Sequence, residues 1–252
     1  HEVASAAMLS GCQLRTLSFE NDIPDPGKIA AAIRPEDIHN PQAGLICMEN
    51  ALSNGRVVPL EVMREVHRVA KEHGVPVHLD GARVFNAAVA LGVDAKELTA
   101  CCDSVMACLS KGLCAPVGSV LCGTKEFIGR ARRTRKAFGG GMRQAGFLAA
   151  AGILALTEMT KRLPEDHENA RYMADRLCAI DGVTLDAPVE INMVFVRFDY
   201  PAEKVLALPE RLREKGIKMQ TMGADMARFV THNDITREDI DYFAACLTEA
   251  LA

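Results

Sequence analysis

An aspartate and a lysine each follow a short apolar segment of the sequence. Residues 75–79 lead directly into Asp80, and residues 104–109 lead through one serine into Lys111. Short apolar runs bounded by glycine are typical of buried strands. Ligand sites of open α/β sheets lie at the carboxyl ends of such strands. We therefore expect Asp80 and Lys111 to meet at one edge of a sheet, where they could do chemistry together.

Apolar residues flank the lysine on both sides, with Leu109 before it and Leu113 and Val117 after it. A charged ammonium is costly to bury, so we expect Lys111 to be buried with its charge removed or covalently modified. A Schiff base with pyridoxal phosphate would achieve this, and an acid such as Asp80 would keep the pyridine nitrogen of that cofactor protonated. A structural ion pair between the two residues is the competing interpretation, and on pattern alone it is the commoner one.

Three longer motifs carry a resemblance to a known family. They are HLDGAR with FNAAVALG after it, SKGL-APVGSVL around Lys111, and GGGMRQAG at 139–146. With these motifs the chain resembles the threonine aldolase branch of the beta-eliminating lyases, which depend on pyridoxal phosphate. The resemblance runs from about residue 2 to residue 232, and it implies the aspartate aminotransferase-like fold of type I. It also implies an N-terminal stretch with a cofactor-phosphate loop and a stacking histidine, so we assign no stacking role to His1.

The same resemblance implies a role for each motif residue. Lys111 would carry the cofactor, Asp80 would face its pyridine nitrogen, and His78, on the same face of the strand, would support Asp80. Arg83 and Arg228 would bind the substrate carboxylate, a bidentate task that suits guanidinium. Without the resemblance, His78 is equally well a core histidine bonded to the backbone, and each arginine is a surface ion-pair residue.

Two further pairs of residues follow from the resemblance. Lys136 and Arg143 would serve the cofactor of a neighbouring subunit, although a plain turn between helices also explains that segment. Glu49 and Asn50 would contact the substrate at the start of a loop that reads ENTHN in the family and ENALS here. Leu52 thus stands where the family has a histidine that contacts the substrate hydroxyl. The cofactor contacts expected in all are Lys111, Asp80, Arg83, Lys136 and Arg143.

The activity that the resemblance implies is cleavage of a β-hydroxy-α-amino acid, threonine or allo-threonine, to glycine and an aldehyde. Two alternatives stay open. Because Leu52 replaces the histidine, a related pyridoxal-phosphate-dependent lyase or racemase acting on another amino acid is the first. A catalytically silent fragment or paralogue that only folds or associates is the second, and it predicts no cofactor binding.

The pattern of strands and helices predicts an α/β domain followed by a smaller one. Residues 1–160 alternate between apolar runs and amphipathic segments, which predicts a mainly parallel sheet with helices on both faces. We expect this large domain to bind pyridoxal phosphate and to be incomplete at its N-terminus. Residues 161–252 predict a smaller α+β domain, in which Thr236 with Asp239 is typical of a helix start.

Individual elements can also be expected from the sequence. The apolar run at 44–48 predicts a central parallel strand, and residues 14–19 predict a strand before it. Apolar stripes predict helices at 60–72 and 84–91, and a helix with a basic face at 125–137.

Composition narrows the class of protein. The 252 residues carry a net charge of −4, and no apolar run approaches the roughly 18 residues of a membrane span, so we expect neither nucleic-acid nor membrane binding. The nine cysteines include no CxxC pair, and Cys47, Cys108 and Cys122 fall in apolar strands. We expect reduced core thiols, a cytoplasmic location and no metal. A shared active site would make the protein a homodimer or homotetramer.

Overall fold

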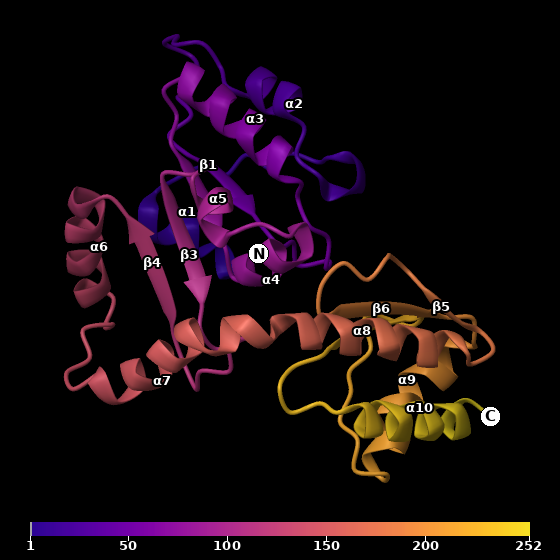
Figure 1. Ribbon diagram of the computed structural model, residues 1–252. Coiled ribbons are helices and arrows are strands. Elements are labelled where there is room, and N and C mark those ends of the chain that lie inside the picture. The colour runs from indigo at the N-terminus through magenta and orange to yellow at the C-terminus, as the bar shows by residue number, and fades with distance from the viewer. Residues whose placement is uncertain (1) are drawn as a thin grey trace.

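The computed structural model describes residues 2–252, which form two β-sheets joined by helices (Figure 1). The first sheet has the strand order β1 (Ile46–Glu49), β2 (Val77–Asp80), β3 (Ser104–Cys108) and β4 (Ser119–Gly123). β1, β2 and β3 run parallel, and β4 pairs with β3 antiparallel. The prediction of a mainly parallel sheet is therefore confirmed.

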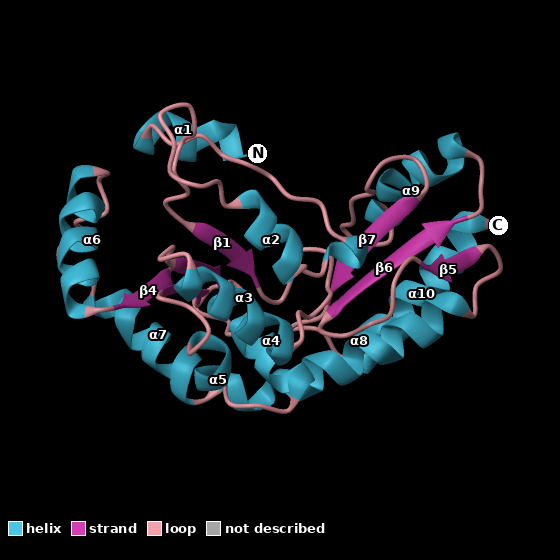
Figure 2. Cartoon of the chain, turned by 90° about the horizontal axis from the view of Figure 1, so that it is seen from above, coloured by secondary structure: helices cyan, strands magenta, loops and turns pink. Residues whose placement is uncertain are grey.

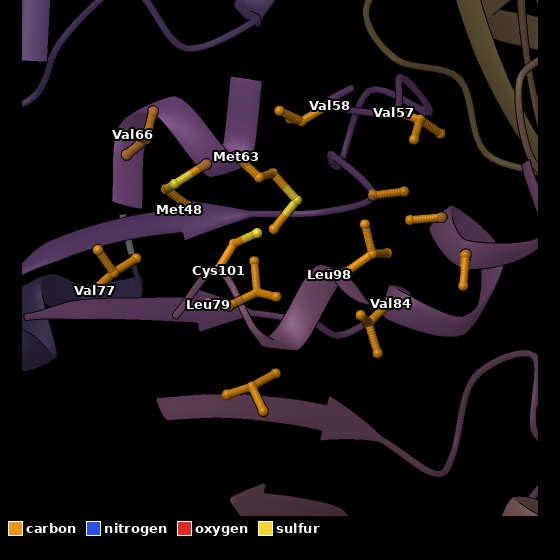
Figure 3. Close-up of a cluster of buried hydrophobic side chains, with 14 of the residues drawn as sticks. Met48, Val57, Val58, Met63, Val66, Val77, Leu79, Val84, Leu98 and Cys101 are labelled. Carbon is orange, nitrogen blue, oxygen red and sulfur yellow. The ribbon is translucent and has the colours of Figure 1, made fainter. Parts of the chain in front are cut away.

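Helices lie on both sides of this sheet. One face packs against α3 (Leu60–Glu72), α4 (Val84–Leu91) and α5 (Ala95–Thr99), and Figure 3 shows the apolar side chains between them. Met48, Leu79 and Val105 of the three parallel strands are buried in this core with Met63 and Leu98 of the helices. Figure 2 shows α1 (Ser5–Ser10) on the opposite side of the sheet. The helices predicted at 60–72 and 84–91 have the predicted bounds.

A run of helices connects the two sheets. It comprises α6 (Lys125–Ala137), α7 (Gly146–Thr157), the 3₁₀ turn η3 (Met159–Arg162) and α8 (Leu163–Cys178). Figure 1 shows α7 and α8 following one another almost end to end from the first sheet to the second. The first residue of α8, Leu163, is buried against Leu109 and Leu113, whereas Leu177 near its end is buried in the second core. α8 therefore contacts both halves of the molecule.

The second sheet is antiparallel and has the order β5 (Val183–Leu185), β6 (Met193–Phe198) and β7 (Met226–Val230). It packs against α8, α9 (Ala202–Arg213) and α10 (Arg237–Leu251). Along β6, Val194 and Val196 face this core, whereas Met193 and Phe195 pack against the core of the first sheet. The predicted helix start is confirmed, because Thr236 and Asp239 form a capping box ahead of α10.

Two predictions about these elements are wrong. β1 is an edge strand of the described sheet and not a central one, because it pairs with β2 alone. Residues 14–19 form no strand; they are largely exposed, and no strand among residues 2–252 offers them the backbone partners that a ladder requires. This N-terminal part contains only short elements: η1 (Glu2–Ala4), α1, η2 (Glu20–Asp22) and α2 (Pro26–Ala32). His1 lies outside the described residues.

The prediction of core thiols is wrong for two cysteines. All nine cysteines are free thiols, but Cys47 and Cys122 are exposed, because they lie on strands of a sheet that is packed tightly on one face only.

No helix among residues 2–252 combines the length and the apolar character needed to cross a membrane.

Candidate active site

The second face of the first sheet carries polar side chains. In the register of the parallel strands, Glu49 lies beside Asp80, and His78 lies beside Ser104. Side chains alternate between the faces of a strand, so these four share one face, opposite the face that holds Leu79. Glu49, His78 and Asp80 are each partly exposed there. The carboxyl end of this face is therefore open to a ligand.

Asp80 is held in place by the turn that follows β2. Its Oδ1 accepts a hydrogen bond from the backbone N–H of Ala82 at 3.0 Å, and the N–H of Gly81 donates to the carbonyl of Met106 at 2.7 Å. A Cβ at position 81 would come within 2.8 Å of that carbonyl, so the turn requires glycine. Within residues 2–252, no donor reaches Oδ2 of Asp80, which leaves this oxygen free to accept a proton donor from a ligand.

His78 has a side-chain partner on the neighbouring strand. Its Nδ1 lies 2.8 Å from Oγ of Ser104. Partial burial lowers the pKa of His78, and the negative charge of Asp80 opposes this effect only in part. The imidazole is therefore neutral at pH 7, and it lies on the same face as Asp80, two residues away along β2.

Lys111 lies in a tight turn, residues 110–114, which we call the Lys111 turn. The N–H of Cys114 donates to the carbonyl of Lys111 at 2.9 Å, and the N–H of Ala115 donates to the carbonyl of Leu109 at 2.9 Å. Leu109 and Leu113 are buried in a small core beneath the turn. The expectation of a buried lysine is wrong, because the Lys111 side chain is exposed. Its apolar neighbours face that core, and the lysine side chain stands outside it.

Five charged groups lie close enough at this edge to influence the pKa of Glu49 or of Arg83. Partial burial raises the pKa of Glu49, and the negative charge of Asp80 adds to the rise. A backbone hydrogen bond from Ser53 and the charges of Arg83 and Lys111 oppose it. Partial burial lowers the pKa of Arg83, and the positive charge of Arg228 lowers it further. The group consists of Glu49, Asp80, Arg83, Lys111 and Arg228.

Arg228 reaches this site from the second sheet. It pairs with Phe195 across β6 and β7, and Phe195 packs against the core of the first sheet, so Arg228 lies on the side that faces the first sheet. When two guanidinium groups lie close together, an anion bound between them offsets their mutual repulsion. The two predicted arginines are thus brought close together, although they are far apart in the sequence.

Other predicted site residues lie elsewhere. Asn50 is fully buried: its Nδ2 donates to the carbonyl of Val58 at 3.0 Å, and its Oδ1 accepts from the N–H of Val58 at 3.1 Å. Its carboxamide therefore braces the loop after β1, and the contact to substrate stays a prediction without support from this geometry. Leu52 packs against the first core. Lys136 and Arg143 are exposed; Lys136 lies on α6, which Figure 1 shows beyond β4, and Arg143 lies on the turn after α6.

Sequence reasoning missed a set of buried polar residues close to the Lys111 turn. Nearly all of them are inaccessible to solvent, and they come from four segments of the chain. The signal in the sequence that could have indicated these residues is the polar run RLPEDHEN at 162–169. It stands at the start of α8, whose later apolar residues are buried in the second core. The set consists of Asn86, Arg162, Asp166, His167, Asn192 and Thr231.

A lysine, two carboxylates and two arginines thus lie near the carboxyl edge of a mainly parallel sheet, where ligand sites of open α/β sheets lie. Comparison with known proteins shows the class of enzyme, a pyridoxal-phosphate-dependent lyase. The model of the family described as Beta-eliminating lyase matches residues 1–199. The chain belongs to this family, and the resemblance stated from the sequence motifs is confirmed.

Curated relatives and solved structures extend the comparison. The chain is 42% identical over 247 residues to the low specificity L-threonine aldolase of Escherichia coli K12, covering 97% of the chain and 72% of that protein. It is 40% identical over 261 residues to low-specificity L-threonine aldolase 1 of Arabidopsis thaliana, covering 100% of the chain and 72% of that protein. A solved threonine aldolase of Leishmania major superimposes with a TM-score of 0.80 at 18% identity, covering 99% of the chain and 73% of that structure. The last match confirms the fold alone.

Proposed function

We propose that this chain is a pyridoxal-phosphate-dependent aldolase that cleaves threonine or allo-threonine to glycine and an aldehyde. The observation that carries the proposal is the grouping of Lys111, Asp80, Arg83 and Arg228 at one edge of the first sheet. The identity of about 40% to low-specificity L-threonine aldolases over nearly the whole chain supports the same reaction.

The residues at this edge fit the cofactor. Pyridoxal phosphate, when bound, supplies an electron sink for cleavage of a bond at Cα of the amino acid. Lys111 has an exposed amine that would hold the cofactor covalently through Nζ. Asp80 has a free Oδ2 that would accept the pyridine N–H, while its Oδ1 stays bonded to Ala82. His78, neutral and bonded to Ser104, would keep the polar face beside Asp80 in one arrangement.

The remaining groups would bind and orient the amino acid. Arg83 and Arg228 would hold its carboxylate between two guanidinium groups, which fixes the direction of the Cα–Cβ bond. Glu49 is the other carboxyl group at this edge, and its raised pKa suits a group that exchanges a proton with the substrate. Cleavage requires loss of the proton from the β-hydroxyl, after which a proton is returned to Cα to give glycine.

Product analysis tests this proposal directly. Purified protein supplied with pyridoxal phosphate and L-threonine or L-allo-threonine is expected to release glycine and acetaldehyde in equal amounts. Lys111→Ala is expected to abolish both products, whereas Lys125→Ala, which removes an amine at the start of α6, serves as a matched control and is expected to retain them. Aldehyde release by Lys111→Ala at the rate of the unchanged protein would sink the proposal.

A second candidate function rests on Leu52. This residue is apolar and packs against the first core, so the loop after β1 offers no imidazole there for a substrate hydroxyl. A lyase or racemase acting on another amino acid would fit the same cofactor site. Pyruvate with ammonia, or an inverted amino acid, in place of glycine and aldehyde would identify it.

We also propose the assembly and the domain boundary that the sequence predicts. Large apolar side chains are exposed along α7 and the turn before it, with Phe147 91% accessible and Phe138 and Met142 also exposed. Such a surface favours a homodimer or homotetramer, whose other subunit would meet Lys136 and Arg143. Light scattering after gel filtration measures the assembly.

The change from one core to the other near η3 supports domains at 1–160 and 161–252. The nine free thiols support a cytoplasmic location.

A further inference from the structure

A cluster of polar side chains is buried beside the Lys111 turn. Asn86 is 4% exposed, His167 3%, Asn192 2% and Thr231 0%. Nδ2 of Asn86 lies 3.1 Å from Nε2 of His167 and donates to Oδ1 of Asn192 at 3.3 Å. Nδ2 of Asn192 donates to the carbonyl of Thr231 at 2.7 Å. We call these four residues the buried polar cluster.

The cluster joins segments that belong to both halves of the molecule. Asn86 lies on α4 beneath the first sheet, and His167 lies on α8. Asn192 precedes β6, and Thr231 follows β7, three residues after Arg228. The hydroxyl of Thr231 donates to the carbonyl of Asp166 at 2.6 Å, which ties the end of β7 to the start of α8. One chain of hydrogen bonds therefore runs from α4 to the strand that carries Arg228.

The cluster also lies next to the Lys111 turn. A Cβ added to Gly112 would lie 3.0 Å from Cδ2 of Leu163 and 3.5 Å from Oδ1 of Asn86. Gly112 is buried, so the backbone immediately after Lys111 lies close beside Asn86 and the first residue of α8. A shift of either support would move the backbone that carries the lysine.

The hydrogen-bond roles of Asn86 and His167 follow from the charge state of the imidazole. Burial lowers the pKa of His167 to about 4, and the positive charge of Arg171 adds to the effect, so the ring is neutral at pH 7. Nε2 of His167 then accepts the proton of the Asn86 amide. With Nδ2 of Asn86 directed at two acceptors, its Oδ1 is directed away from them, on the side of Gly112. Burying four polar groups costs free energy unless all are bonded, and here they fix one arrangement of both halves.

We propose that Asn86 and His167 are positioning residues of the reaction, which set the Lys111 turn at a fixed distance from Arg228. The inference rests on the proposed function, because it assigns the cofactor to Lys111 and the substrate carboxylate to Arg228. The cluster acts through those two residues and touches neither substrate nor cofactor. Its loss moves the amine relative to the guanidinium while both side chains remain present.

Three substitutions test this role. His167→Leu removes the acceptor of the Asn86 amide, and His167→Gln restores an acceptor on a side chain of similar reach. The matched control is Asn169→Leu, which removes another buried polar group of α8, one that donates to the carbonyl of Ile235 at 3.2 Å and, within residues 2–252, bonds to no member of the buried polar cluster. Each protein is measured at a temperature where its thermal unfolding curve shows it folded.

The main measurement is the rate at which pyridoxal phosphate attaches to Lys111. The reaction is followed by the absorbance of the bound cofactor, stopped with borohydride, and assigned by mapping the modified peptide. We expect His167→Leu to slow attachment roughly ten- to hundredfold, as for other misplaced catalytic groups, and His167→Gln to recover most of the rate. Asn169→Leu is expected to attach the cofactor at the wild-type rate. kcat for L-threonine should fall with the attachment rate, with KM changed little.

The outcomes separate this inference from the proposed function. If His167→Leu and Asn169→Leu attach the cofactor at equal rates, the positioning role is overturned while the proposed function stands. If His167→Gln behaves as His167→Leu, the hydrogen bond to Asn86 is not the cause and the role is likewise overturned. If the unchanged protein is not modified at Lys111 at all, the proposed function fails and the inference fails with it.

Discussion

On one face of the first sheet, Met48, Leu79 and Val105 are buried against three helices, whereas on the other face Glu49, His78 and Asp80 stay partly exposed. β1 and β2 supply residues to both sets, because side chains alternate along a strand. Leu79 and Asp80 are neighbours in the chain, yet one is fully buried and the other has a carboxylate oxygen free for a ligand. The face that a residue occupies therefore separates residues that stabilise the fold from residues that are available for chemistry.

Substitution of the polar face is expected to have the largest effect on catalysis. Asp80→Asn removes a negative charge at the position proposed for the pyridine nitrogen but keeps the bond to Ala82. We expect kcat/KM for L-threonine to fall about 10²- to 10³-fold, as when other preorganised charges are removed from active sites, with the midpoint of urea unfolding unchanged. Steady-state aldehyde release and urea titration measure the two effects. A large loss of stability in Asp80→Asn would contradict the division between the faces.

Substitution of the packed face is expected to do the reverse. Leu79→Ala leaves a cavity among Met48, Met63 and Leu98, and deletion of a fully buried leucine costs roughly 3 kcal/mol of unfolding free energy. Activity per folded molecule should change little, because the side chain points away from the site. Urea unfolding together with aldehyde release per active site checks this. An unchanged free energy of unfolding for Leu79→Ala would show that the packed face does not stabilise the fold.

The buried polar cluster predicts a loss of stability in acid. The pKa of His167 is about 4 in the folded protein, against an ordinary value of 6.5. Below pH 6.5, His167 becomes protonated in the unfolded chain, but in the folded chain it stays neutral down to about pH 4. The free energy of unfolding therefore falls as the pH drops from 6.5 to 4. The full difference amounts to about 3 kcal/mol. Urea unfolding at pH 7 and at pH 4.5 measures it.

His167→Gln is the control for that pH dependence, because glutamine does not titrate. This variant should lose less stability between pH 7 and pH 4.5 than the unchanged protein. Equal losses in the two proteins would show that other groups cause the acid effect.

The smallest expected effect concerns backbone strain in the Lys111 turn. Cys114 has a φ of +59°, in the left-handed region that favours glycine. Cys114→Gly is expected to stabilise the protein by about 1 kcal/mol, since a side chain in that region carries a cost of this order. Cys114→Ala keeps the strain and removes only the thiol, so it should give no gain. Thermal unfolding of the two variants side by side measures the difference.

Local patterns in the sequence predicted most of the fold. Side-chain patterns predicted helices at 60–72, 84–91 and 125–137. The bounds of α3, α4 and α6 agree with these predictions. The strand predicted at 14–19 is wrong because an apolar run forms a strand only beside another strand. Nothing in residues 14–19 themselves carries that information.

The sequence predicts the position of a site residue where that residue directly follows a strand. It does not predict contacts between segments that are far apart in the chain. Asp80 and Lys111 follow strands whose ends share an edge, so local patterns were enough. The direction of Asn50 depends on Val58, and the bond between Asn86 and His167 joins residues 81 positions apart. The exposure of Lys111 likewise depends on which side of the turn the core of Leu109 and Leu113 occupies. These features come from tertiary packing.

We propose that the protein binds pyridoxal phosphate through Lys111, over the polar face of the first sheet. The most direct measurement is to mix the purified protein with pyridoxal phosphate, record the absorption spectrum before and after borohydride, and identify the modified peptide. We expect a visible band that borohydride removes and a single modified residue, Lys111. Absence of the band, or modification spread over the exposed lysines of other segments with Lys111 untouched, would contradict it.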